Sequence, residues 1–124
     1  MRPVYKVKLD EVLEKLRRVA GGRRLAVLFG SAAESGAVHD VDVLIDGSDL
    51  GEALRLAAEI EEALGVPADV VPAGLAPPCL VAEALTRGVV VAADWDYYDE
   101  LLYLSVGQCQ DLKVKLREAG IGIS

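Results

Sequence analysis

The sequence is poor in the residues on which several classes of protein depend. Its 124 residues include two cysteines, one histidine, one methionine and no asparagine. Two cysteines are too few for a disulfide-rich scaffold, and they lack the paired spacing of a zinc site. No apolar run approaches the roughly 18 residues that a membrane span needs, and no charged-then-apolar signal peptide opens the chain. We therefore expect a cytoplasmic protein without a membrane partner.

The two cysteines, Cys79 and Cys109, are expected to be half-buried free thiols in a reducing cytosol. The scarcity of asparagine, glutamine and methionine, which are thermolabile, is typical of thermophilic proteins. An intracellular disulfide is less unusual in such proteins. A bond between the two cysteines therefore stays open as an alternative.

Basic residues are also in the minority. Thirteen Lys and Arg stand against 20 Asp and Glu, which gives a formal charge of −7. Binding to nucleic acid depends on neutralising phosphates with clustered Lys and Arg, so direct nucleic-acid binding is not expected. Apolar residues make up 52% of the chain and charged residues 27%, as in an ordinary globular protein. The length fits a single domain over residues 1–124.

The order of apolar and polar residues predicts alternating helices and strands. Apolar residues at helical spacing predict a helix over 9–20, and the apolar run over 25–29 suits a buried central strand. Strict alternation predicts a second strand over 40–46, followed by a helix over 50–64. A short strand, a helix, a fourth strand and a final helix are expected next, over 68–71, 77–87, 89–92 and about 96–119.

Together these segments predict an α+β fold with α/β-type layers, in the order α-β-β-α-β-α-β-α. The segment 30–39, which joins the first two strands, is expected to be a polar loop. It is too short for a helical crossover, so these strands should be antiparallel and the four-stranded sheet mixed, with helices packed on it. The final helix packs either on its own domain or on a second copy, and the second alternative makes a homodimer.

Two aspartates lie in the second predicted strand. Asp40 and Asp42 are two residues apart, so both side chains project from the same face, with Cα atoms roughly 6 to 7 Å apart. Two like charges this close are costly unless a cation lies between them. Hard oxygen ligands suit Mg²⁺ or Mn²⁺, so the pair predicts a divalent metal site. Asp69, on the third predicted strand, could complete this site if that strand adjoins the second.

Gly30 and Ser31 end the neighbouring predicted strand. Glycine lets the backbone approach a ligand closely, and the N–H groups beyond it, with the Ser31 hydroxyl, can hold a phosphate. A phosphate cradle beside metal-binding carboxylates is what a nucleotide-handling site requires. The alternative is an ordinary turn beside a solvated sheet face, but the combination of both features favours the functional interpretation.

This combination resembles the minimal nucleotidyltransferase (MNT) subgroup of the DNA polymerase β-like nucleotidyltransferase superfamily. The resemblance implies a nucleotidyltransferase-like fold in which Gly30 and Ser31 contact the triphosphate of ATP or another NTP. It implies that Asp40, Asp42 and Asp69 hold two Mg²⁺ ions and that Asp69 helps to deprotonate the attacking hydroxyl. The implied reaction moves a nucleoside monophosphate, AMP in the case of ATP, to an acceptor hydroxyl on a protein partner.

The same resemblance implies a second class of function. Members of this subgroup are often antitoxins that pair with a HEPN-domain ribonuclease toxin, sometimes by adenylylating it. A HEPN-domain partner is therefore expected, with or without retained catalysis, and an acidic chain suits a partner whose RNA-facing surface is basic. A third alternative is a protein that binds nucleotide without turnover.

The sequence departs from the subgroup's pattern after Gly30 and Ser31, although the resemblance covers roughly residues 10–95. Eight residues separate Ser31 from Asp40, where ten are common. The segment begins Ala32-Ala33-Glu34-Ser35-Gly36, where arginines often follow in the subgroup. It therefore supplies little positive charge for a triphosphate, unless Arg23, Arg24 or the metal ions compensate.

Overall fold

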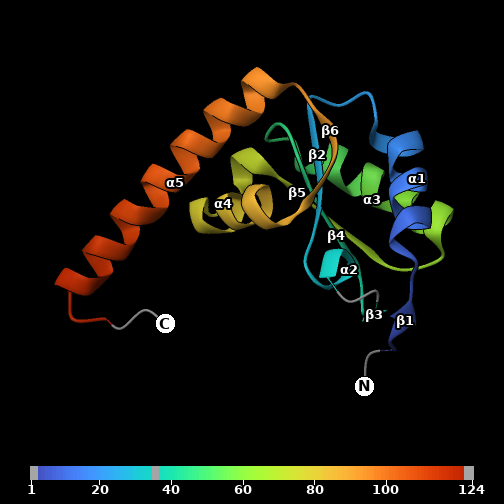
Figure 1. Cartoon of the computed structure of the whole chain (residues 1–124), viewed down its shortest axis with the longest axis horizontal. Helices are drawn as coiled ribbons and strands as arrows, with labels where there is room; N and C mark the ends of the chain where they lie inside the picture. The colour runs from blue at the N-terminus through green and yellow to red at the C-terminus, as the bar shows by residue number, and fades with distance from the viewer. Residues whose placement is uncertain (1–2, 35–36, 122–124) are drawn as a thin grey trace.

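A four-stranded sheet with helices on both faces forms the body of the protein (Figure 1), and the computed structural model describes residues 3–34 and 37–121. The strands of this sheet are β2 (Leu25–Phe29), β4 (Val41–Ile45), β5 (Ala68–Pro72) and β6 (Val89–Ala93). The helices are α1 (Leu9–Ala20), α2 (Ser31–Glu34), α3 (Leu50–Leu64), α4 (Pro78–Arg87) and α5 (Trp95–Glu118), with a 3-10 turn, η1 (Ala73–Leu75). Two further strands, β1 (Tyr5–Lys6) and β3 (Ala37–Val38), pair with each other.

The sheet is mixed, and its strands lie in the order β5-β4-β2-β6. Strand β2 is antiparallel to both β4 and β6, whereas β4 is parallel to β5. The predicted antiparallel pairing of the first two long strands is confirmed, and the third predicted strand does adjoin the second. The α+β fold class predicted from the sequence is confirmed as well.

The predicted polar loop over 30–39 is wrong in part. It contains a one-turn helix, α2, and the short strand β3, while residues 35 and 36 lie outside the described residues. Elements of four and two residues are too short to give a periodic pattern of apolar residues. Strand β3 also depends on β1, a partner near the start of the chain, so local sequence carries no signal for it.

Alternating side chains of the strands supply two apolar layers. Leu28 and Val43 face the layer under α1 and α3, whereas Val27 and Leu44 face the layer under α4 and α5. All four side chains are fully buried. Because Asp42 lies between Val43 and Val41, it points to the same face as Leu44, which is the face that α4 and α5 cover.

Helix α5 packs on α4 of its own chain. The side chain of Asp94 caps it by accepting hydrogen bonds from the backbone N–H groups of Asp96 and Tyr97. The hydroxyl of Tyr98 donates to the backbone oxygen of Leu85 in α4 at 2.7 Å. In Figure 1, α5 continues past α4 and away from the sheet. A homodimer through this helix stays a prediction.

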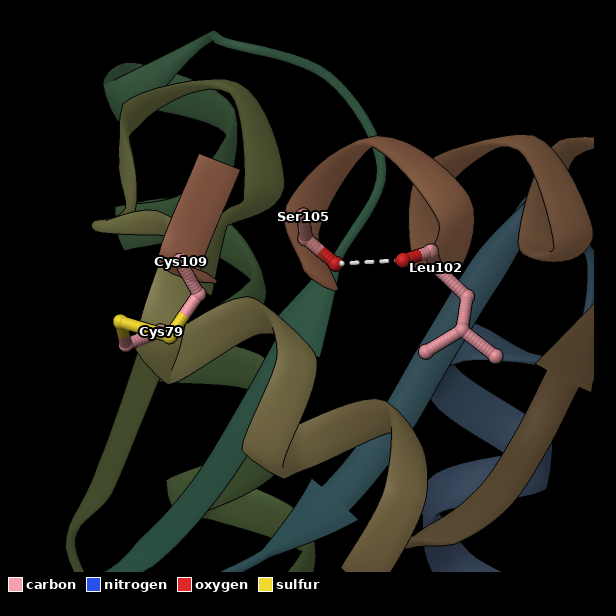
Figure 2. The surroundings of a disulfide bond; sticks show 4 residues. All are labelled: Cys79, Leu102, Ser105 and Cys109. Atoms are coloured by element: carbon pink, nitrogen blue, oxygen red, sulfur yellow. Dashed lines mark hydrogen bonds between the residues drawn. A yellow bond between two sulfur atoms is a disulfide. The ribbon is translucent and has the colours of Figure 1, made fainter. Parts of the chain in front are cut away.

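A disulfide joins α4 to α5, so the prediction of two free thiols is wrong. Cys79 in the first turn of α4 is bonded to Cys109 in α5, with the two Cα atoms 4.8 Å apart (Figure 2). One helical turn before Cys109, the buried Ser105 hydroxyl donates to the backbone oxygen of Leu102 at 3.2 Å. The close packing of α4 on α5 brings the cysteines together, and this packing is not visible in their sequence separation of 30.

Within residues 3–34 and 37–121, no helix has both the length and the apolar character needed to cross a membrane. The cytoplasmic location expected from the sequence stays a prediction.

Candidate functional site

The sheet aligns two of the three predicted metal ligands. Asp42 in β4 lies opposite Phe29 of β2 on one side and opposite Asp69 of β5 on the other. Residues opposite each other in a parallel pair project to the same face, so the side chains of Asp42 and Asp69 point the same way. Asp42 is half-buried, whereas Asp69 is exposed on the edge strand. This face is the one covered by α4 and α5.

Gly30 lies directly against the Asp42 carboxylate. A Cβ atom at Gly30 would lie 2.6 Å from Oδ2 of Asp42, closer than two such atoms can approach. Gly30 also has a φ of +76°, in the left-handed region that favours glycine. The turn after β2 and the approach of Asp42 therefore both require glycine at this position, and Ser31 begins α2 immediately after it.

Asp40 is the third predicted metal ligand. It lies directly before β4 and is half-buried. The N–H of the following residue, Val41, donates to the backbone oxygen of Pro67 at 2.8 Å. Among the residues that the structure describes, no three His, Cys, Asp or Glu side chains form a group that could hold a metal ion. The three-carboxylate metal site stays a prediction.

The donor set still suits Mg²⁺ or Mn²⁺ delivered with a nucleotide. In nucleotide-handling sites Mg²⁺ is bound by one or two carboxylates together with substrate phosphates, rather than by an all-protein cage. Asp42 and Asp69 supply two hard oxygen ligands on one face. Gly30, against which the Asp42 carboxylate lies, is itself exposed. The residues present therefore fit this ion, provided that phosphate oxygens complete its coordination.

A cavity of about 340 Å³ opens next to Gly30 and Ser31. Phe29 and these two residues form one side, and α4 forms the other; the α4 residues are Leu80, Glu83, Ala84 and Arg87. No pattern in the sequence marks α4 as part of the site. A basic residue in the last turn of a helix is common for electrostatic reasons alone, so Arg87 gave no distinctive signal.

Arg23 and Arg24, which precede β2, lie at the end of that strand opposite Gly30. They therefore cannot supply positive charge to a triphosphate at Gly30. Arg23 donates to Oδ1 of Asp46 at 3.0 Å and forms an ion pair with Glu52. Burial by itself lowers the pKa of Arg23, but its hydrogen bonds and charge interactions with Glu52 and Asp46 outweigh burial and raise the pKa. Arg24 lies 4.4 Å from the centroid of the Tyr97 ring. A five-residue strand, roughly 17 Å long, separates both arginines from the glycine end.

Replacing Gly30 by alanine is expected to destabilise the protein more than the same change at Gly65. The two glycines have similar positive φ values, 76° and 71°, but a Cβ at Gly65 would meet nothing within 4 Å. Gly65→Ala should therefore cost only the backbone penalty, about 1–2 kcal/mol. Gly30→Ala should cost that penalty and also displace the Asp42 carboxylate. Denaturant-induced unfolding of both variants measures the difference.

An Asp42→Ala background supplies the control for this comparison. With the carboxylate removed, the costs of Gly30→Ala and Gly65→Ala should become similar. Equal costs in the wild-type background would contradict the contact between Gly30 and Asp42.

Comparisons with known proteins find the fold but no related sequence. No protein-family model matches the chain, and no curated protein matches it. A toxin-antitoxin structure with AMP-PNP aligns with a TM-score of 0.73 and 19% identity, over 91% of this chain and 95% of that one. A tri-AMPylated Shewanella oneidensis HEPN toxin in complex with MNT antitoxin aligns with a TM-score of 0.68 and 19% identity, over 90% and 91%. The chain thus has the fold of the MNT antitoxins, and the nucleotidyltransferase-like fold predicted from the sequence is confirmed.

Proposed function

We propose that this protein is a Mg²⁺-dependent nucleotidyltransferase that moves AMP from ATP to a hydroxyl group of a HEPN-domain protein. The observation that carries the proposal is the in-register pairing of Asp42 with Asp69, with the Asp42 carboxylate against Gly30. The shared fold supports it, because one structural neighbour was solved with AMP-PNP and another with a tri-AMPylated HEPN toxin.

In the proposed reaction, the acceptor oxygen bonds to the α-phosphorus of ATP while the bond to pyrophosphate breaks. Bound Mg²⁺ would neutralise the triphosphate and favour ionisation of the acceptor hydroxyl. Asp42 and Asp69, together with Asp40, would hold the ions, and the backbone after Gly30 with the Ser31 hydroxyl would bind phosphate oxygens. Asp69 would accept the acceptor's proton and pass it to solvent. Its place on the edge strand β5 leaves it accessible to an acceptor as large as a protein.

Pairing with a HEPN-domain protein is a second candidate function, and it does not require catalysis. The structural neighbours include toxin-antitoxin complexes. Helix α5 presents large apolar side chains to solvent, and these exposed residues are Trp95, Tyr103, Leu104, Leu112 and Val114. An open, shallow pocket of about 660 Å³ lies along the same helix, between Asp99 and Asp111. Exposed apolar surface of this kind is typical of sites where proteins associate.

The test uses the purified chain with a HEPN-domain protein from the same source. We expect the two proteins to co-purify, and we expect incubation with MgATP to increase the partner's intact mass by one or more AMP groups. Isothermal titration calorimetry of MgATP into the chain alone provides the second readout. An absence of binding at millimolar MgATP would contradict the nucleotidyltransferase function, whereas a failure to co-purify would contradict the pairing.

A further inference from the structure

The end of α4 lies beside the end of β2, at the candidate site. Leu28 of β2 is opposite Val89 of β6, and the two strands are antiparallel. Arg87 is the last residue of α4, and Gly88 alone separates it from β6. Arg87 and Gly30 line one cavity, so the end of α4 lies beside the turn after β2.

Gly88 keeps the end of α4 in this position. A Cβ atom there would lie 2.5 Å from Cγ1 of Val27 and 2.7 Å from the backbone oxygen of Leu28, so only glycine allows the contact. The N–H of Gly88 donates to the backbone oxygen of Ala84 at 2.8 Å and closes the helix. Arg87 therefore projects from a backbone that is fixed against the strand leading to Gly30.

Among the residues that the structure describes, the guanidinium of Arg87 has one weak interaction, with Glu83. Its ion pair with Glu83 is 4.0 Å long, and 73% of the arginine side chain is exposed. Exposed pairs of this kind contribute little, because water and salt screen them. Arginine also presents a planar set of donors that matches phosphate oxygens in pairs.

Charges of opposite sign flank Gly30 at the end of the sheet where β2 ends and β4, β5 and β6 begin. Asp42 and Asp69 lie on one side, toward β5, and Arg87, with Glu83 beside it, lies on the other side, toward β6. The two aspartates can bind cations, and Arg87, on the other side of Gly30, can bind an anion. A metal-bound triphosphate carries both kinds of charge, and it can contact both sides with Gly30 between them.

We propose that Arg87 binds the phosphate oxygens of the nucleotide at Gly30 and Ser31. It would supply the positive charge that the segment beginning Ala32-Ala33 lacks, from a helix far along the chain. This inference rests on the proposed function and adds a phosphate-binding residue to it. Because the contact is to the polyphosphate, Arg87 would favour nucleoside triphosphates over nucleoside monophosphates.

The experiment measures the Kd of MgATP and of AMP by calorimetry for the full chain and its variants. Arg87→Ala is expected to weaken MgATP binding by about 10- to 100-fold, the usual range for a charged hydrogen bond. Arg87→Lys should keep part of the affinity, and AMP binding should change much less than MgATP binding. Thermal unfolding of each variant checks that the fold is retained.

Arg18→Ala is the matched control. Arg18 is also an exposed helical arginine, with 72% of its side chain accessible and a glutamate, Glu14, one turn earlier. It lies on α1, which packs on the opposite face of the sheet. Arg18→Ala should leave the Kd of MgATP unchanged.

The outcomes separate this inference from the proposed function. If the wild-type chain binds MgATP and Arg87→Ala binds it equally well, the role of Arg87 is wrong and the proposed function stands. If Arg18→Ala weakens binding as much as Arg87→Ala, the effect is one of net charge and the inference is again wrong. If the wild-type chain binds no MgATP, the proposed function fails and the inference fails with it.

Discussion

Asp42→Asn is expected to slow the proposed AMP transfer by about a thousandfold while leaving the fold intact. Asp42 is the central residue of the candidate site, opposite Asp69 and against Gly30. Asparagine has nearly the same shape but carries no charge, so it would hold a cation poorly. A metal ion contributes several kcal/mol of charge stabilisation to such a reaction, and each 1.36 kcal/mol corresponds to a factor of ten in rate. Initial rates with labelled ATP and the partner protein measure the loss.

Two further measurements make this prediction specific. Asp10→Asn removes the same charge from an exposed position in the first turn of α1, and it should leave the transfer rate unchanged. Asp42→Asn should still co-purify with the proposed HEPN-domain partner, because pairing is expected to be independent of the carboxylate. A transfer rate equal to that of the wild type would contradict a role for Asp42 in the reaction.

Removal of the Cys79–Cys109 disulfide is expected to lower the free energy of unfolding by about 3 kcal/mol. The bond closes a loop with a sequence separation of 30, and a cross-link of this span removes conformational entropy from the unfolded chain. The double variant Cys79→Ser, Cys109→Ser should therefore unfold at a lower temperature, by about 10 °C in a domain of this size. Thermal unfolding under non-reducing conditions measures the shift.

A reducing agent supplies the control for the disulfide. Dithiothreitol should bring the wild-type protein to the stability of the double variant and should not change the double variant itself. The hydrogen bond from Tyr98 to Leu85 does not involve sulfur, so the first half of α5 should remain helical in both cases. A wild-type protein whose unfolding is insensitive to the reductant would contradict the bond.

The long elements were predictable because each carries its own pattern. In the segment of β4, Val41, Val43 and Ile45 alternate with a second set of residues, and this period of two is typical of a strand. The second set is Asp40, Asp42, Leu44 and Asp46. Helix α3 is capped at its start by Asp49, whose side chain accepts a hydrogen bond from the Glu52 N–H, and at its end by Gly65, which has a positive φ. Both end signals are readable in the sequence.

The candidate site was predictable only in part, because it depends on which strands lie together. Asp40, Asp42, Gly30 and Ser31 belong to consecutive segments, and their residue types suggested a common role. The in-register pairing of Asp42 with Asp69 required the parallel contact between β4 and β5. Arg87 required a further pairing, between β2 and β6, and nothing in its local sequence marks it. The disulfide depended on helix packing in the same way.

Helix α4 connects two surfaces that otherwise have no residue in common. One side of it lines the cavity beside Gly30, and the Cys79–Cys109 bond fastens it to α5, which presents the open, shallow pocket. A molecule on either surface therefore meets a helix that the other surface also uses. By thermodynamic linkage, if a nucleotide in the cavity changes the affinity for a protein on α5, that protein changes the affinity for the nucleotide by the same factor.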